Sequence, residues 1–253
     1  IEVYNVEIDS INITYSKFTD NANDNLDNQL LIKSTNKRLN FQSNVIEYTQ
    51  DKRVRAIEVQ VSESADLVDS IFTNCKYTDS SVYISASAST SPSLGMTNCT
   101  FADCVTNNYV VLLQNGHTTI NDCSFAFTNS QTACSGLNID SPNSVSISNC
   151  VFEKNNNKNG ENTGCLFIHR ETGDMSNFYL NNVLFDSCTG NTYNAIYVKG
   201  GCGRIESITG LNIRNIQNAQ ANVYIFGFDI PNADLTFTEC TFSNCKSNNE
   251  NGG

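Results

Sequence analysis

Residues 96–104 of the chain read MTNCTFADC, and the same pattern returns along the sequence. The clearest further copies are INDCSFAFT (120–128), ISNCVFEKN (147–155), LNNVLFDSC (180–188) and FTECTFSNC (237–245). Each copy has an apolar residue followed five positions later by a phenylalanine, which we call the anchor. Weaker copies place Phe72, Ile213, Ile46 and Ile13 in the anchor position. Nine copies in one chain predict a repeat architecture, in which each unit is stabilised by stacking on its neighbours.

The spacing of the anchors sets the size of the repeat. Eight intervals cover residues 13 to 242, which gives a mean spacing of about 28.6 residues. Between each pair of anchors lies a short apolar segment, such as Val110–Leu113 or Leu166–Ile168, bounded by Asn, Ser, Thr or Gly. Such segments are typical of strands. No stretch carries an apolar stripe of helical period over three turns.

A repeat of this size distinguishes between the known β architectures. A propeller blade needs ~40–45 residues, and a leucine-rich repeat needs a Leu-x-x-Leu-x-Leu frame that this chain lacks. Two or three short strands fit one coil of a parallel β-helix, with successive coils ~4.8 Å apart. The sequence therefore predicts an all-β, single-stranded parallel β-helix (a β-solenoid) of eight to nine coils of ~28 residues. We expect residues 1–253 to form one domain, cut from a longer chain.

In such a stack, equivalent residues form columns. The phenylalanine column contains Phe72, Phe101, Phe125, Phe152, Phe185 and Phe242. Cysteines occupy two positions beside it: Cys99, Cys123, Cys150 and Cys240 precede an anchor by two residues, and Cys75, Cys104, Cys188 and Cys245 follow one by three. A coil spacing of ~4.8 Å lies within the Cα range of disulfides, ~4.4–6.8 Å. We therefore expect structural disulfides, with columns of buried thiols, which pack as small hydrophobes, as the alternative.

Composition and charge exclude several classes of function. Asn accounts for 38 of the 253 residues, and it favours turns over helices. The net charge is −11, which argues against nucleic acid as a partner because that binding depends on Lys and Arg contacts to phosphate. The longest apolar run, Tyr109–Leu113, is far short of the ~20 residues of a membrane helix. We expect neither nucleic-acid binding nor direct insertion of this segment into a membrane.

The cysteines and the glycosylation sequons bear on the compartment. Eleven Cys is a high number for a cytosolic protein, and no C-x2-C pair of the zinc-ribbon type is present. Asn-x-Ser/Thr sequons occur at Asn12 and Asn98. These features predict an extracellular or cell-surface glycoprotein modified at Asn12 and Asn98. We expect no metal or other cofactor.

The repeat unit resembles that of a known family. Phe152 and Asn155 match the F-x-x-N motif of the polymorphic outer-membrane proteins, and four other anchors match it with Cys in the Asn position. The second motif of that family, G-G-A-[ILV], is present only in degraded form, for example as Ser135-Gly136-Leu137. The resemblance covers nearly the whole chain. It implies a right-handed parallel β-helix of the pectin-lyase-like type and a surface adhesin.

Enzymes with this shape make catalysis the main alternative. A polygalacturonase carries Asp-Asp and Gly-His-Gly motifs, and neither occurs here. Gly203-Arg204-Ile205-Glu206 only approaches a third motif, Arg-Ile-Lys, with Glu in place of Lys. We therefore do not expect an enzyme. A diverged carbohydrate-active enzyme is one alternative. Another is a glycan-binding module with stacked tyrosines, for which the residues are Tyr83, Tyr109, Tyr197 and Tyr224.

The sequence thus favours a non-enzymatic rod or adhesive segment of a cell-surface or filament protein. The expected partners are other protein chains or cell-surface glycans, with end-to-end self-association of the rod as a further possibility. A polar loop interrupts the repeat at residues 153–164, and insertions of this kind often form the binding face of a solenoid. Its candidate contact residues are Asn155, Asn156, Asn157, Lys158 and Asn159.

Overall fold

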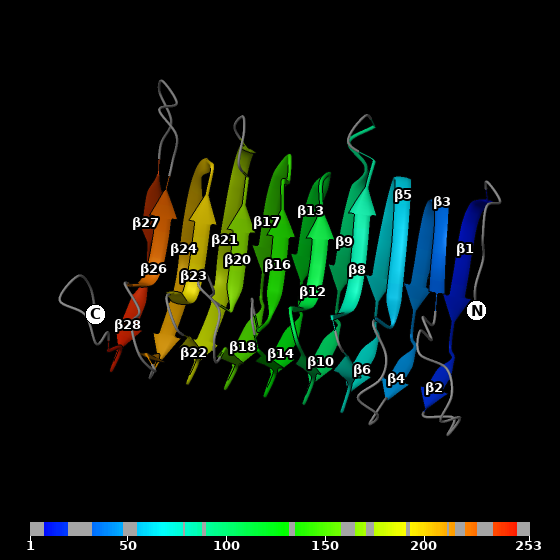
Figure 1. The fold of residues 1–253 in the computed structure, drawn as a ribbon. Helices are drawn as coiled ribbons and strands as arrows, with labels where there is room; N and C mark the ends of the chain where they lie inside the picture. The colour runs from blue at the N-terminus through cyan, green and yellow to red at the C-terminus, as the bar shows by residue number, and fades with distance from the viewer. Residues whose placement is uncertain are drawn as a thin grey trace.

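The chain winds as a parallel β-helix whose coils lie side by side between the two ends of the molecule (Figure 1). The computed structural model describes residues 8–19, 32–47, 55–77, 79–87, 90–131, 135–157, 165–170, 175–190, 193–211, 213–215, 221–226 and 235–246. In these ranges all the regular structure is strand. No described element is a helix of the length and apolarity needed to cross a membrane.

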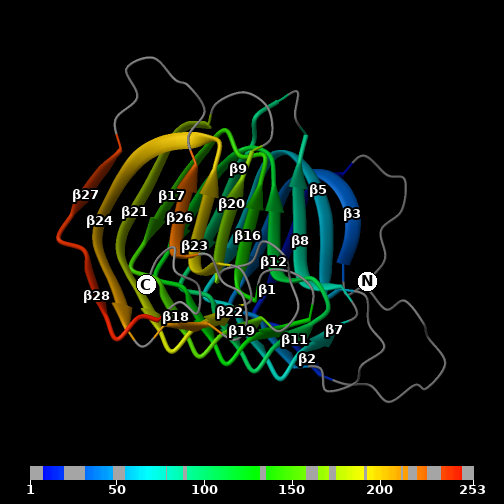
Figure 2. The same ribbon diagram turned by 60° about the vertical axis from the view of Figure 1, so that its left-hand side comes forward.

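The strands form four faces around the coil (Figure 2). The wide face holds β1 (Ile8–Thr14), β9 (Ser93–Thr97), β13 (His117–Asn121), β17 (Ser144–Ser148) and β27 (Thr236–Thr238). The anchor face holds β2 (Lys17–Thr19), β4 (Val45–Glu47), β6 (Ile71–Thr73), β10 (Thr100–Ala102), β14 (Ser124–Ala126), β18 (Val151–Glu153) and β28 (Thr241–Ser243). The corner face holds β7 (Lys76–Tyr77), β11 (Val105–Thr106), β15 (Asn129–Ser130), β19 (Asn156–Asn157), β22 (Thr189–Gly190) and β25 (Arg214–Asn215).

The back face holds β8 (Ser80–Ala86), β12 (Tyr109–Gln114), β16 (Leu137–Asp140), β20 (Leu166–His169), β23 (Tyr193–Lys199) and β26 (Ala221–Phe226). Four long strands bend from one face to the next. They are β3 (Ile32–Gln42) and β5 (Ile57–Val68), which join the back and wide faces, and β21 (Met175–Asp186) and β24 (Gly201–Leu211), which join the wide and anchor faces.

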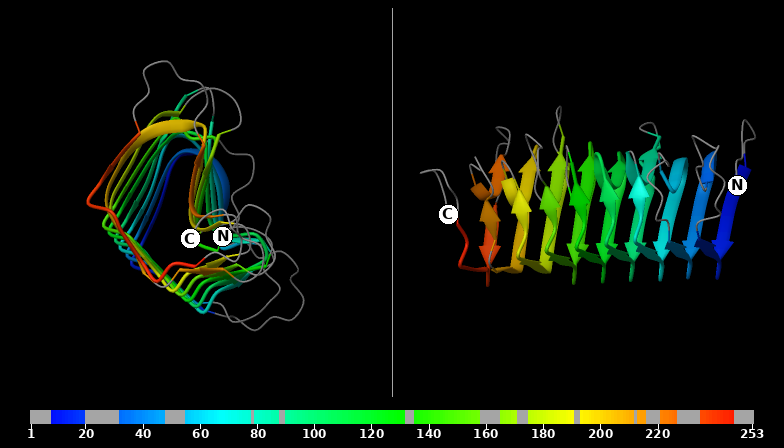
Figure 3. Two further views of the ribbon diagram at one scale, coloured as in Figure 1. Left: turned by 90° about the vertical axis from the view of Figure 1, so that its left-hand side faces the viewer. Right: turned by 60° about the horizontal axis from the view of Figure 1, so that its bottom comes forward.

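Every coil pairs in parallel with the coils on either side of it, as the end-on view in Figure 3 shows. On the anchor face, for example, Phe101 lies opposite Phe72 on one side and Phe125 on the other. Six coils carry a strand on the corner face and are therefore complete. The expected eight to nine coils are reached only by adding the partial coils at both ends, whose described residues have no corner strand.

The anchors form a continuous column of rings inside the coil. Phe72, Phe101, Phe125, Phe152 and Phe185 are fully buried, and neighbouring rings are 4.6 to 5.1 Å apart with their planes within 11° of parallel. This arrangement follows from the fold, because a parallel in-register ladder repeats each side chain at one strand spacing. Each ring pair adds about 0.5–1.5 kcal/mol to the gain from burial.

Two of the weaker anchors were wrong. Phe18, not Ile13, lies opposite Ile46, while Ile13 lies opposite Phe41 in the column five residues before the anchors. Near the other end Gly210, not Ile213, takes the anchor position between Phe185 and Phe242. The ring of Phe242 occupies the space that a side chain on Gly210 would fill. An apolar residue at a suitable spacing was mistaken for the anchor, since these coils differ in loop length.

Backbone corners on both sides of the anchor explain the abundance of Asn. The residue three positions before each anchor has a positive φ; these residues are Tyr15, Ser43, Asp69, Asn98, Asp122, Asn149, Asn182, Ser207 and Glu239. A second corner with positive φ follows two positions after the anchor in most coils. Asn and Asp tolerate this left-handed conformation better than other residues with a side chain. The polar composition is therefore a requirement of the coil, which must turn sharply beside each anchor strand.

The cysteines serve as hydrogen-bond donors at these corners, and the expected disulfides are absent. None of the nine described cysteines forms one. Cys99 donates its S–H to the Leu67 carbonyl (3.4 Å) and Cys104 to the Phe72 carbonyl (3.6 Å), each on the preceding coil. Ser70 donates in the same way from the position that Cys99 takes one coil later. Equivalent Cβ atoms on successive coils are one strand spacing apart, ~4.8 Å, beyond the ~3.5–4.5 Å that a disulfide requires.

Gly136 is required by its contact with the phenylalanine column. A Cβ on Gly136 would overlap the Cys165 carbonyl oxygen and lie 3.0 Å from Cε1 of Phe152. We expect Gly136→Ala to lower the free energy of unfolding by about 1–3 kcal/mol, the usual cost of overpacking a core. Urea denaturation measures the change.

Gly95→Ala is the matched control for this substitution. The nearest atom to its added Cβ is the end of the Asp66 side chain, which can move aside. We expect the control to change stability by less than ~0.5 kcal/mol. Equal effects of the two substitutions would contradict the contact between Gly136 and the column.

Candidate functional site

The back face carries the densest polar network on the outer surface of the described coils. We define the back-face strip as Arg55, Glu58, Asp79, Tyr83, Asn108, Gln114, Asp140 and His169. Side chains alternate between the two faces of a strand, so the residues between the buried Val82, Ile84, Val111 and Leu113 point outward. Parallel pairing then places Glu58 beside Tyr83, and Gln114 beside Asp140. The network therefore crosses several coils.

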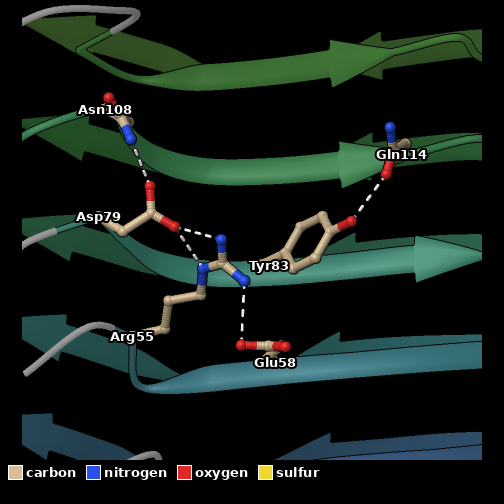
Figure 4. A network of polar contacts seen from close by, with 6 residues as sticks. All are labelled: Arg55, Glu58, Asp79, Tyr83, Asn108 and Gln114. Atoms are coloured by element: carbon tan, nitrogen blue, oxygen red, sulfur yellow. Dashed lines mark hydrogen bonds and ion pairs between the residues drawn. The ribbon is translucent and has the colours of Figure 1, made fainter. Parts of the chain in front are cut away.

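Arg55 organises one half of the strip (Figure 4). Its guanidinium lies 3.0 Å from Glu58, donates through Nε to Asp79 at 2.5 Å, and lies 4.5 Å from the centre of the Tyr83 ring. Asn108 donates to the other oxygen of Asp79 at 2.5 Å. Each carboxylate is thus paired with a charge, and the planar fork of an arginine suits two such partners at once. The group joins three coils with balanced charge.

The other half of the strip continues through neutral donors and acceptors. The Tyr83 hydroxyl donates to Gln114 at 2.7 Å, and Gln114 donates to Asp140 at 2.9 Å. His169 Nδ1 lies 3.7 Å from Asp140, which also accepts a hydrogen bond from Ser141. Each link spans one coil, so this half binds β8 to β20 across the surface.

Loss of Arg55 should destabilise the coil measurably. Arg55→Met keeps the length of the side chain but leaves Glu58 and Asp79 without their cation, and both carboxylates are largely covered. We expect a loss of about 1–3 kcal/mol in the free energy of unfolding. Chemical denaturation of the variant measures it.

The matched control is Lys17→Met. Lys17 forms a 3.8 Å ion pair with Glu47 in which both side chains are exposed to solvent. Pairs of this kind contribute little, so we expect a change within ~0.5 kcal/mol. If Arg55→Met were as neutral as this control, the Arg55 cluster would have no role in joining the coils.

Aromatic side chains extend the back face toward its C-terminal coils, but their ring faces are occupied. Phe167 and Tyr197 stack at 4.5 Å with planes 6° apart, and Tyr193 contacts the other side of Tyr197 at 4.9 Å. Tyr197 is only 7% exposed. The face of Tyr83 lies under Arg55, Tyr109 pairs in register with Ser80, and the Tyr224 side chain lies outside the described residues. These rings stiffen the rod and offer no flat platform to a sugar.

The described surface holds little acid–base chemistry. Burial raises the pKa of the Asp66 carboxyl, but its in-register neighbours are Asn40 and Gly95, so no second carboxylate stands in its column. His117 is on the wide face, 2.8 Å from Ser144, and His169 is on the back face. Among the described residues no three His, Cys, Asp or Glu side chains gather as metal ligands. The closest approach to a catalytic pair is Asp140 with His169.

The expected contact loop does not project as a unit. Asn155 and Asn157 are buried, and Asn156 is half-buried. Asn155 takes the position three after the anchor, where its Oδ1 accepts from the Thr128 amide at 3.2 Å. Burial removes these two residues from any partner contact, while Lys158 and Asn159 lie outside the described residues.

The sequons lie on the surface. Asn12 is exposed on β1 and Asn98 is exposed at a corner, where its amide donates to Asp69 at 2.8 Å. Both side chains are therefore accessible for a modification that remains a prediction.

Sequence reasoning missed the Arg55 cluster. Residues 51–55 stand out as a basic stretch, but the partners of Arg55 lie 3 and 24 residues further on. The signal was present only in the coil offset, which brings Asp79 beside Arg55 one coil later.

A comparison of the sequence with models of known protein families, with curated proteins and with solved structures finds no match. The parallel β-helix itself stands on its strand pairing. Its resemblance to adhesin repeats of the pectin-lyase-like type rests on the anchor motif alone and belongs to the proposal that follows.

Proposed function

We propose that this chain is a non-enzymatic, extracellular β-solenoid that acts as a stiff rod or adhesive segment of a cell-surface or filament protein. One observation carries the proposal, namely the unbroken in-register pairing with five stacked phenylalanine rings through the coils. Every coil buries its apolar side chains against its neighbours, so bending the rod would open a packed core. The charge-balanced back-face strip adds cross-links on the outside.

Stiffness is the property to test first. Fluorophores placed through unnatural amino acids at Lys17 and Ser243 would report the distance between the two end coils. Eight coil spacings predict a separation of ~38 Å along the axis. We expect one narrow distance distribution that persists until the chain unfolds. A broad distribution under native conditions would overturn the rod.

The adhesive role has its own experiment. Beads coated with the chain should bind cells or immobilised cell-surface glycans, with partners at the exposed loops and corners and not at the occupied ring faces of the back face. Tyr197→Ala should therefore affect stability more than binding. Binding lost in a Tyr197→Ala variant that remains folded would instead favour a glycan-binding module.

The contact between Asp140 and His169 favours one second candidate, a diverged carbohydrate-active enzyme. Carboxylate–histidine pairs can serve as general bases when the partners are within hydrogen-bond reach of each other and of substrate. At 3.7 Å this pair is looser than a catalytic hydrogen bond. Incubation with neutral and acidic polysaccharides should yield no shortened product. A product that disappears in His169→Ala would replace the rod proposal with catalysis.

A further inference from the structure

The two end coils of the described structure present the same columns that join coils inside the molecule. At one end Phe237 is 51% and Phe242 is 41% exposed, although their counterparts Ile147 and Phe152 within the rod are fully buried. At the other end Ile13 and Phe18 occupy the corresponding positions and are only partly buried. Each end therefore holds half of a coil-to-coil contact.

The register of the internal contacts defines how these halves would meet. Inside the chain, residues of the same column lie opposite each other on successive coils, as Phe101 does with Phe125. Applied to the ends, this register puts Phe242 of one copy on Phe18 of a second copy and Phe237 on Ile13. The backbone groups match as well, because the amide after each corner cysteine donates to the preceding coil, as Ser124 does to Cys99. Cys240 offers the equivalent carbonyl to Lys17 of the second copy.

Charge favours the same arrangement. Glu239 lies at the corner of the last described coil, and Lys17 is exposed on the first. In the internal register these two side chains meet on one edge with opposite signs. A contact between two copies of the same end would instead bring Glu239 against Glu239, which is repulsive.

We propose that copies of this chain associate head to tail, with the coil that contains Phe237 and Phe242 stacked on the coil that contains Ile13 and Phe18. The contact is heterologous and does not close on itself, so it generates linear filaments. This inference rests on the proposed rod and adds a polarity and an interface to it. Each copy carries a net charge of −11, so salt should strengthen the association by screening repulsion.

Analytical ultracentrifugation over a range of protein concentrations tests the proposal. The unmodified chain should form a series of oligomers that grows with concentration and with ionic strength. Phe242→Asp and Phe18→Asp should each remain monomeric. Phe127→Asp is the matched control, because Phe127 is 44% exposed but lies at a corner in the middle of the rod, and it should assemble like the unmodified chain.

Mixing the two end variants gives the decisive result. The Phe18→Asp copy keeps its C-terminal face and the Phe242→Asp copy keeps its N-terminal face, so an equal mixture should form dimers and nothing larger. Two misfolded variants cannot produce that result, and Phe237→Asp provides a second block of the same face.

Three outcomes would overturn the inference. They are an unmodified chain that stays monomeric up to its solubility limit, end variants that assemble like the control, and a mixture that forms no dimer. Each would leave the rod itself intact as long as the distance between residues 17 and 243 in the monomer stays narrow.

Discussion

Replacing Phe125 by alanine is expected to lower the free energy of unfolding by about 3–5 kcal/mol, the range for deleting a fully buried aromatic side chain. The ring is stacked between Phe101 at 5.1 Å and Phe152 at 4.8 Å, and none of its surface is exposed. The loss removes two ring contacts and opens a cavity at the centre of the column. Denaturation by guanidinium, followed by circular dichroism, measures the change.

The position of Phe125 predicts a second consequence. Each coil is stabilised by its neighbours, so a defect at mid-rod weakens the coupling between the two halves. We expect the unfolding transition of Phe125→Ala to broaden or to split into two steps.

Phe127→Ala is the control within the same coil. Phe127 lies two residues away, points to solvent and contacts Lys154 through its ring face at 4.7 Å. We expect its loss to change the free energy of unfolding by less than ~1 kcal/mol, because an exposed cation–π contact contributes about that much at most. Similar losses for Phe125 and Phe127 would show that the column does not hold the coils together.

Raising the pH above about 9 is expected to destabilise the chain steeply. A hydrogen bond with Cys123 and burial raise the pKa of Cys99, and a hydrogen bond with Cys75 and burial raise the pKa of Cys104. A hydrogen bond with Cys150, together with burial, raises the pKa of Cys123 to about 12. In the unfolded chain these thiols lose their protons near pH ~8.5.

The sign of the effect follows from the proton count. Between the unfolded and folded pKa values the folded chain holds more protons than the unfolded chain, so stability falls as pH rises. The loss is about 1.4 kcal/mol per pH unit for each thiol that stays protonated. Hydrogen bonding from Cys123 lowers the pKa of Cys150, which therefore acts only below its ordinary pKa and in the opposite sense.

Urea midpoints measured from pH 8 to pH 11 test this expectation. The double variant Cys99→Ala/Cys123→Ala should show a shallower fall over the same range. Cys240→Ala serves as the control, because Cys240 holds the same position in its coil but is only partly buried. A stability that does not change over this range would mean that the buried thiols are not retained in the protonated form.

The periodic part of the molecule was predictable from sequence. In-register stacking brings identical positions into contact, so the pattern around Phe101, Phe125 and Phe152 is itself the contact map of the anchor face. The prediction failed at Ile13 and Ile213, where loop length, not spacing from the motif, sets which residue enters the column. It failed for the disulfides because the Cα distance alone was weighed, without the Cβ separation that a parallel ladder imposes.

The candidate site was much less predictable than the fold. The partners within the back-face strip lie one coil apart, and Glu58, Asp79 and Asp140 fit no repeated motif. The contact loop was drawn from its polarity, yet Asn155 and Asn157 are polar residues that face the inside of a corner. Composition reports that a segment is polar, but it does not distinguish an exposed turn from a buried one.

The sequence by itself determined the coil, its strands and the columns beside the anchors, since each of these is a local pattern that recurs with the repeat. Only the tertiary structure decided which side chains meet between coils at the back face, which thiols donate to which carbonyls, and which rings remain uncovered at the ends. Those outcomes depend on the offset between successive coils, and that offset is set by the packing of the whole stack and not by any single segment.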